Sequence, residues 1–281
     1  MSEGPAARPR RLVLLGHPLG HTLSPLIHGA ALRSAGIGAT YEALDVPPAD
    51  LDRAIDRLIA EGAAGNVTIP HKPAVFARCA WRTATADRAG AVNTFWSADG
   101  ALHGENTDVG GFDASVRALV GEPDACRVAL IGAGGASAGV ATAVERWTGA
   151  SLVLWGRTPD RVAALADRFP TLTIAPSLGR ALADATLVVN ATPLGLRDDA
   201  FPADLDALPA DAAVLDLVYR RGETAWVRAA RGRGHRASDG LPMLVEQAAL
   251  AFERWFAVAA DREAMWDAVG GRPAWMTQAS S

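Results

Sequence analysis

The chain has 281 residues, 49% of them hydrophobic, and a formal net charge of −4 from 27 basic and 31 acidic side chains. This length allows two domains with separate cores, and no apolar run is long enough to span a bilayer. No basic stretch is dense enough to indicate nucleic-acid binding, so we expect neither a membrane nor a nucleic-acid partner. Cys79 and Cys126 lie far apart without metal-ligand spacing, which favours a reduced, cytoplasmic protein that holds no metal.

Strand-like and helix-like segments alternate along the first part of the chain, which is typical of α/β architecture. The first predicted helix has Ser24 as its N-cap and Pro25 at its first helical position. In chain order the pattern predicts a strand over 11–16, a helix over 24–35, a strand over 41–46, a helix over 49–61 and a strand over 65–69.

Beyond residue 108 the alternation becomes more regular, as in a doubly wound nucleotide-binding sheet. A long helix over 239–260 ends this part, with an apolar stripe at Leu244, Ala248, Ala251 and Trp255. The elements before it are strands over 127–131, 151–155, 173–175, 185–190 and 213–217, and helices over 136–147, 159–169 and 223–232.

These elements predict an α/β protein of two domains with a cleft between them. The first is a split α/β substrate-binding and catalytic domain, formed by residues 1–107 plus 241–281. The second is an inserted Rossmann-like domain, residues 108–240, which we expect to bind a dinucleotide.

The segment GNVTIPHK, residues 65–72, places an amide, a hydroxyl and an amine at the end of a short apolar strand. Lys72 follows Pro70 by two residues, where the chain leaves the sheet, and catalytic groups often occupy such places. Burial readily shifts the pKa of a lysine, which suits this side chain to acid/base work. A solvated turn lysine is the alternative that this segment alone leaves open.

A strand, a glycine turn and a helix follow one another over residues 128–137. The glycines allow a tight turn and let the backbone approach a pyrophosphate at the helix N-terminus. A tight turn without a ligand is the alternative. The candidate cofactor-binding residues of this turn are Gly132, Gly134, Gly135, Ala136 and Ser137.

The next strand lacks the acidic residue that usually binds the ribose 2′-hydroxyl of NAD. Arg157 is placed instead to pair with a 2′-phosphate, with the Thr158 hydroxyl as a second donor and Arg161 one helical turn further on. NADP is therefore favoured over NAD, and a surface arginine is the alternative. Asn190 and Thr192 follow a later strand at the same edge, where we expect them to line the ribose–nicotinamide side.

Polar side chains for a substrate gather in three other segments. Thr22 and Ser24 stand at the N-terminus of the first helix, which favours an anion such as a substrate carboxylate, although Ser24 could also be a plain N-cap. Asn93 adds an amide, and Asp108 adds a carboxylate that could also cap the following helix. A lysine such as Lys72 beside an aspartate meets the demand of carbonyl reduction, because the alkoxide formed by hydride addition must receive a proton.

With these motifs together, the sequence resembles the shikimate dehydrogenase family over about residues 12–256. The motifs are specific as an ordered set. They are HTLSP at 21–25, GNVTIPHK at 65–72, GAVNT at 90–94, GENTDVGGF at 104–112, GAGGAS at 132–137, NATPLG at 190–195 and DGLPMLVEQAALAF at 239–252.

The resemblance implies NADP-dependent, reversible reduction of 3-dehydroshikimate to shikimate in the biosynthesis of aromatic amino acids. It makes Lys72 and Asp108 the catalytic pair. It assigns the substrate to side chains that carry hydroxyl or amide groups: Thr22 and Ser24 for the carboxylate, Asn66, Thr68, Asn93 and Gln247 for the ring hydroxyls, and Tyr219 near the substrate and the nicotinamide.

Three positions depart from the family pattern. Thr22 replaces a serine and Pro242 a glycine, which leaves quinate or aminoshikimate dehydrogenation by a family paralogue as the alternative. Gly156 replaces an asparagine, which removes one polar contact to the adenosine phosphate. Gly240, in the last motif, joins the predicted cofactor site. A non-catalytic NADPH-binding regulator is the alternative from another class, and the chain is expected to be a monomer or a homodimer.

Overall fold

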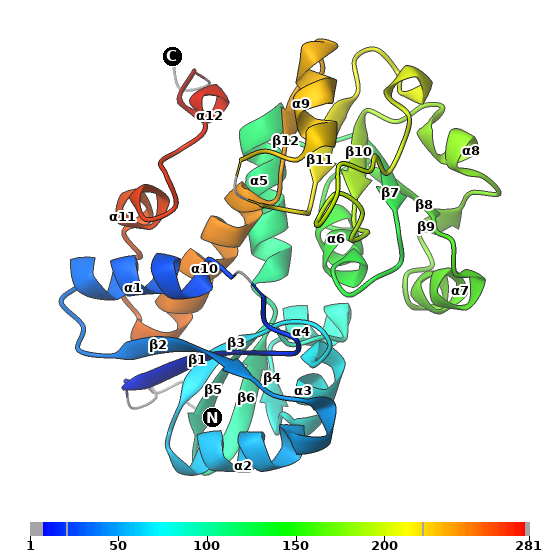
Figure 1. The fold of residues 1–281 in the computed structure, drawn as a ribbon. Helices are drawn as coiled ribbons and strands as arrows, with labels where there is room; N and C mark the ends of the chain where they lie inside the picture. The colour runs from blue at the N-terminus through cyan, green and yellow to red at the C-terminus, as the bar shows by residue number, and fades with distance from the viewer. Residues whose placement is uncertain (1–7, 21, 221, 279–281) are drawn as a thin grey trace. The chain divides into compact units, whose positions relative to one another are not determined.

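The computed structural model describes residues 8–20, 22–220 and 222–278. His21 of the HTLSP motif and the two ends of the predicted first domain, 1–7 and 279–281, lie outside the described residues. The chain forms two compact units: unit 1 is Met1–Gly111 with Leu244–Ser281, and unit 2 is Phe112–Met243. Each unit contains one sheet with helices packed against it (Figure 1), so the predicted α/β class is confirmed.

Unit 1 contains a six-stranded mixed sheet with the strand order β2-β1-β3-β5-β6-β4. In this sheet β5 is antiparallel to both of its neighbours, and every other adjacent pair is parallel. The elements of unit 1 are β1 Arg11–Gly16, α1 Ser24–Ser34, β2 Thr40–Asp45, the 3₁₀ turn η1 Pro48–Asp50, α2 Leu51–Ala60, β3 Ala64–Val67, α3 Lys72–Arg78, β4 Trp81–Arg82, α4 Ala84–Ala89, β5 Thr94–Ala98, β6 Ala101–Glu105, α11 Arg262–Asp267 and α12 Ala274–Gln278.

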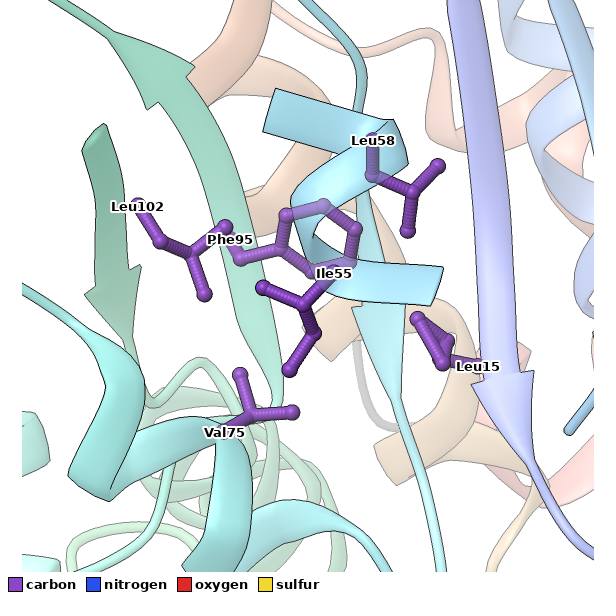
Figure 2. Close-up of a pocket in the computed structure, with 6 residues that line it drawn as sticks. All are labelled: Leu15, Ile55, Leu58, Val75, Phe95 and Leu102. Atoms are coloured by element: carbon purple, nitrogen blue, oxygen red, sulfur yellow. The ribbon is translucent and has the colours of Figure 1, made fainter. Parts of the chain in front are cut away.

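One hydrophobic core of unit 1 lies between the sheet and helices α2 and α3. Apolar side chains from three strands and both helices point toward one another in Figure 2, and each is almost fully buried. Val75 stands one turn after the first residue of α3, so this core fixes the start of that helix. The six side chains are Leu15 from β1, Ile55 and Leu58 from α2, Val75 from α3, Phe95 from β5 and Leu102 from β6.

Unit 2 contains a six-stranded sheet in which all strands are parallel, in the order β12-β11-β10-β7-β8-β9. Numbered within the unit, this is the Rossmann order, and its topological switch point lies between β7 and β10. The elements are β7 Arg127–Ile131, α6 Ser137–Val144, β8 Ser151–Trp155, α7 Pro159–Arg168, β9 Leu172–Ile174, α8 Leu178–Leu182, β10 Leu187–Asn190, the 3₁₀ turn η2 Leu205–Ala207, β11 Ala213–Asp216, α9 Ala225–Gly232 and β12 Ala237–Ser238.

Two continuous helices carry the chain from one unit into the other. They are α5, Asp108–Val120, and α10, Leu241–Phe256. The predicted domain boundaries stand at the first residues of these helices, whereas the units divide inside them, after Gly111 and after Met243.

Two predicted helices differ from the observed ones at their ends. Ser24 is the first residue of α1, whose N-cap is Leu23, so the prediction that Ser24 caps this helix is wrong. Leu23 already has near-helical angles (φ −91°, ψ −9°), and the Thr22 hydroxyl accepts the Ser24 N–H at 3.2 Å. The long helix predicted to reach residue 260 ends at Phe256, because Ala257 adopts a positive φ of 51° that leaves the helical region.

The hairpin of β5 and β6 was not predicted, although its turn has a recognisable sequence. Ala98 pairs with Ala101, and the two residues between them, Asp99 and Gly100, have φ values of 53° and 71°. Asp-Gly with two positive φ angles is typical of a two-residue hairpin turn. The hairpin completes the sheet of unit 1 and places the GAVNT motif beside β3.

Among the residues that the structure describes, no helix has both the length and the apolar character that a bilayer crossing needs. Within the same ranges, no group of three or more His, Cys, Asp or Glu side chains could hold a metal ion. Cys79 and Cys126 are free thiols, and burial raises the pKa of Cys79 to about 11, so that this thiol stays protonated near neutral pH.

Candidate active site

Lys72 and Asp108 form an ion pair in unit 1. Lys72 is the first residue of α3 and Asp108 the first residue of α5, and Lys72 Nζ donates to Asp108 Oδ2 at 2.5 Å. The two side chains are only 15% and 11% exposed. Lys72 is also the only lysine in the sequence. The other 26 of its 27 lysine and arginine residues are arginines. Wherever a charge alone is needed this chain has arginine, which indicates that position 72 needs an amine.

The amide of Asn93 orients this pair. Asn93 Nδ2 donates to Asp108 Oδ1 at 2.8 Å and to Thr107 Oγ1 at 3.0 Å, while its Oδ1 accepts the Thr107 N–H at 2.7 Å. Gln247, from α10, lies with its Oε1 3.3 Å from Asn93 Nδ2, and its own amide nitrogen donates to the Leu244 carbonyl. The structure therefore brings together four of the predicted site residues. Asn93 makes one hydrogen bond to Asp108 and three with Thr107.

Asn66 extends the network along the sheet through residues that the sequence analysis missed. The Tyr41 hydroxyl donates to Asn66 Oδ1 at 2.8 Å, and Asn66 Nδ2 donates to Thr94 Oγ1 at 3.0 Å and to the Asn93 carbonyl at 3.3 Å. A backbone carbonyl can only accept, so the orientation of the Asn66 amide is settled. The Asn66 oxygen therefore points to Tyr41 and its amide nitrogen to β5.

A buried histidine lies behind this network. His28, on α1, is fully buried, and its ring stacks on Tyr41 with centroids 4.3 Å apart and an interplanar angle of 12°. Burial lowers the pKa of His28 to about 3, with the nearby Asn66 side chain acting in the opposite direction, so the ring is neutral at neutral pH. Nothing in the sequence around His28 distinguishes it from the other residues on the buried face of α1.

Thr22 and Ser24 place their hydroxyls side by side at the start of α1, with Thr22 Oγ1 3.3 Å from Ser24 Oγ. Thr68 follows the end of β3, and its methyl group lies so near Gly16 that a Cβ built on Gly16 would be 2.4 Å from it. Two predicted substrate-binding residues thus lie at the start of α1, and a third follows the end of β3. The threonine at position 22 keeps the hydroxyl that the resemblance requires.

The glycine turn of unit 2 lies at the topological switch point. Gly132 has a φ of 103°, and a Cβ built on it would lie 2.7 Å from Thr192 Cγ2, so the ends of β7 and β10 meet closely here. The Ser137 hydroxyl accepts the Gly134 N–H at 3.0 Å and donates to the Gly132 carbonyl at 2.9 Å. Ser137 is fully buried, so its side chain shapes the turn, whereas the predicted role was contact with the cofactor.

The end of β8 carries the predicted 2′-phosphate site. Arg157, Thr158 and Arg161 are all exposed, and within the described residues neither arginine has a carboxylate partner. A Cβ built on Gly156 would lie 2.9 Å from Val162 Cγ2, which gives a packing reason for glycine where the family pattern has asparagine. Two free guanidinium groups beside a hydroxyl fit a phosphate.

Asn190 is completely buried, in contrast to the prediction that it lines the cofactor crevice. Its Oδ1 accepts from the Thr192 N–H and hydroxyl at 2.9 and 2.7 Å, and its Nδ2 donates to Asp216 Oδ1 at 2.8 Å. These bonds order the ends of β10 and β11. Tyr219 follows β11 in unit 2 and is half-buried, and a Cβ built on Gly240 would lie 2.3 Å from the Leu217 carbonyl oxygen, which requires glycine for packing.

Asp239, just after β12, is the acidic group of unit 2 with a strongly raised pKa. Burial raises the pKa of Asp239 to about 6, assisted by Glu223 and Asp216 and opposed by the Leu241 N–H and by Arg231. The folded state therefore holds a proton on Asp239 more tightly than the unfolded chain does. Stability from this group is fully present below pH 4 and is lost as the pH rises through 6.

Replacing Asp239 by asparagine should therefore raise the free energy of unfolding at pH 8 by about 2 kcal/mol, because the uncharged amide avoids the cost of a buried charge. The asparagine oxygen can still accept the Leu241 N–H that Asp239 accepts at 3.1 Å. Urea unfolding at pH 8 and pH 4.5 measures this, and the advantage of the variant should shrink at the lower pH. A variant less stable than the parent at pH 8 would contradict the prediction.

Fold and site define a two-unit α/β protein with a Rossmann-type dinucleotide fold and a buried lysine–aspartate pair. Residues 14–95 match the family model of the shikimate dehydrogenase substrate binding domain, and residues 240–269 match that of the shikimate 5′-dehydrogenase C-terminal domain. The shikimate dehydrogenase (NADP(+)) of Methylocella silvestris is 44% identical over 90% of this chain and 92% of its own length. The chain belongs to the shikimate dehydrogenase family.

Solved structures of the family are also similar. Shikimate 5-dehydrogenase from Thermus thermophilus, in complex with NADP(H) and shikimate, matches with a TM-score of 0.83 and 38% identity over 92% of this chain and 98% of that one. Shikimate dehydrogenase from Aquifex aeolicus matches with a TM-score of 0.88 and 32% identity over 94% and 98% of the two chains. Both likenesses extend over the two units.

Proposed function

We propose that this protein is an NADP-dependent shikimate dehydrogenase that interconverts 3-dehydroshikimate and shikimate. The observation that carries the proposal is the buried ion pair of Lys72 with Asp108, 2.5 Å apart, in a chain whose family relatives bear this activity in their names. Hydroxyl and amide groups surround the pair, as a polyhydroxylated substrate requires. Unit 1 is then the substrate domain and unit 2 the NADP domain.

Lys72 is the proton donor of the proposed reduction. NADPH, when bound, supplies the hydride that adds to the carbonyl carbon of 3-dehydroshikimate. The carbonyl oxygen becomes a hydroxyl by taking a proton from Lys72 Nζ, and in the oxidation the neutral amine takes that proton back. Asp108, held by Asn93 at 2.8 Å, keeps the lysine in place through both steps.

The remaining site residues have supporting roles in this proposal. Thr22 and Ser24 hold the substrate carboxylate, and Asn66 accepts a hydrogen bond from a ring hydroxyl. In unit 1, Thr68 and Gln247 are the other proposed substrate contacts, and Tyr219 of unit 2 stays a prediction from the resemblance. NADP is held by the backbone of the 132–137 turn and by Arg157, Thr158 and Arg161, whose exposed guanidinium and hydroxyl groups fit its 2′-phosphate.

An initial-rate assay of the purified protein tests the proposal. NADP reduction is followed with shikimate and with quinate, and both are repeated with NAD. We expect turnover with shikimate and NADP to exceed the other three combinations by at least tenfold. Higher turnover with quinate, or preference for NAD, would assign the chain to a catabolic paralogue. If no combination of shikimate or quinate with NADP or NAD gives turnover, aminoshikimate is assayed next, and turnover of that compound would make it the substrate.

The setting of the proposed enzyme is the cytoplasm, which its free thiols fit. As a monomer or homodimer it would need no other macromolecule for this reaction, and light scattering of the assayed sample measures which of the two it is. A regulator that binds NADPH without turnover remains the alternative from another class. Binding of NADPH together with no turnover of any of the three compounds would favour it.

A further inference from the structure

Asp45 uses both of its carboxylate oxygens on the segment that follows β1. Asp45 is the last residue of β2, and in the parallel register of the sheet it stands beside Gly16, the last residue of β1. Its Oδ1 lies 2.7 Å from His17 Nδ1, and its Oδ2 accepts the Leu19 N–H at 2.8 Å. One side chain thus holds two residues of the neighbouring chain segment.

The segment held by Asp45 leads directly to the two hydroxyls at the start of α1. Leu19 precedes Thr22 by three residues, and Ser24 follows two residues later. Gly20, between these points, is exposed, and a Cβ built on it would meet nothing within 4 Å. The Leu19 side chain packs close to Gly16, since a Cβ built on Gly16 would lie 2.6 Å from Leu19 Cδ2, whereas no side chain packs at Gly20. The hydrogen bonds to Asp45 therefore add to the packing of Leu19 in setting the path of this segment.

We propose that Asp45 is a positioning residue for the substrate carboxylate: by holding His17 and Leu19 it places Thr22 and Ser24 where their hydroxyls bind that carboxylate. The proposal rests on the proposed function. The hydrogen bond from His17, and then that from the Leu19 N–H, hold the pKa of Asp45 below its usual value, so the carboxylate remains a charged acceptor at neutral pH. Asp45 acts through the segment and touches no reacting atom.

A second contact from the same strand end separates substrate binding from the chemical step. His71, which precedes Lys72, lies with its Nε2 2.7 Å from the carbonyl oxygen of Val46, the residue after Asp45. This contact uses the backbone of Val46, so a change of the Asp45 side chain leaves its acceptor in place. Loss of the Asp45 carboxylate should therefore weaken binding of the substrate and spare the placement of Lys72.

The test compares Asp45→Asn with Asp52→Asn in the full chain. Asp52, on α2, is 82% exposed, so its variant removes the same charge from the same unit without touching the segment after β1. We expect Asp45→Asn to raise the KM for shikimate about tenfold, to leave kcat and the KM for NADP within twofold, and to differ in this way from Asp52→Asn. A KM equal to that of the control variant would overturn the proposal.

A second readout separates positioning from a general loss of structure. Methyl shikimate lacks the carboxylate charge, so Asp45→Asn should weaken its competitive binding less than twofold. Ser24→Ala should raise the KM for shikimate by itself, and adding Asp45→Asn to it should then cost much less than tenfold, because the two act on one contact. Equal losses for shikimate and its methyl ester, or full additivity with Ser24→Ala, would overturn the proposal.

The test still decides the role of Asp45 if its variant fails to fold or if shikimate is not the substrate. If Asp45→Asn does not fold, His17→Gln takes its place, since it removes the ring nitrogen that contacts Asp45 Oδ1, and the same selective rise in KM is expected at a smaller size. An unchanged KM in that variant would overturn the proposal. If the unmodified protein turns over quinate or aminoshikimate but not shikimate, the proposed function fails, and the same comparison with that carboxylate substrate still decides the role of Asp45.

Discussion

Replacing Lys72 by arginine should lower kcat for NADP-dependent shikimate oxidation by a hundred- to ten-thousandfold, the range expected when an acid/base group is lost. Arginine keeps the positive charge and can still pair with Asp108, but its guanidinium does not release a proton near neutral pH. Lys72→Ala should lose as much turnover, because it removes the proton donor altogether. The dissociation constant for shikimate should change far less than kcat in the arginine variant.

Arg78→Lys is the control for the effect of exchanging lysine and arginine on the same helix. Arg78 is the last residue of the same helix, α3, and is 41% exposed. This variant should keep turnover within twofold of the parent, and its circular dichroism spectrum should match that of the parent. Turnover within tenfold of the parent in both Lys72 variants would mean that another group moves the proton, and the proposed mechanism would be wrong.

Removing the guanidinium groups of Arg157 and Arg161 together should raise the KM for NADP by about a hundredfold and leave the KM for NAD nearly unchanged. The two arginines are exposed at and just after the end of β8, and they are the two cationic residues of the predicted 2′-phosphate site. Charge-assisted hydrogen bonds to a phosphate are among the stronger polar contacts. NAD has no 2′-phosphate and makes no such hydrogen bonds, so its KM does not depend on these two guanidinium groups. The ratio of kcat/KM for the two dinucleotides measures the change.

Arg168→Ala is the matched control for that pair, because Arg168 is an exposed arginine on the same helix, α7, at its opposite end. It should leave both KM values within twofold. A double variant that loses affinity for NADP and NAD equally would point to damage of the fold of unit 2, and one that loses neither would place the 2′-phosphate elsewhere.

The parallel sheet of unit 2 could be predicted from local sequence because its strands are short apolar runs flanked by turns. Strands β7 and β8 begin and end where they were predicted, at Arg127–Ile131 and Ser151–Trp155. A strand buried on both faces, such as β7 after its first residue, carries its signal in its own residues. The hairpin of β5 and β6 carries polar and aromatic residues, TFWSA and ALHGE, and only its Asp-Gly turn announces it.

The candidate site divides in the same way. Lys72 and Asp108 could be nominated from their motifs, whereas the contacts of Asn66 with Tyr41 and Thr94 depend on which strands are neighbours. Thr94 faces Asn66 only through the antiparallel register of β5 with β3. For Asn190 and Ser137, the position in a motif predicted contact with the cofactor. Both side chains are buried, and their hydrogen bonds order the fold. Burial of a polar group is a tertiary property that no local pattern contains.

Because Lys72 is the only lysine in the sequence, a label on lysine would report on the proposed active site alone. Its side chain is 15% exposed, and its ε-amine is held by the Asp108 carboxylate in the proposed active site. An amine-directed reagent can therefore react with one lysine side chain in this sequence, besides an α-amino group. Isotopically enriched methyl groups, which preserve the charge of a lysine, would give one side-chain resonance and with it a spectrum of the site alone.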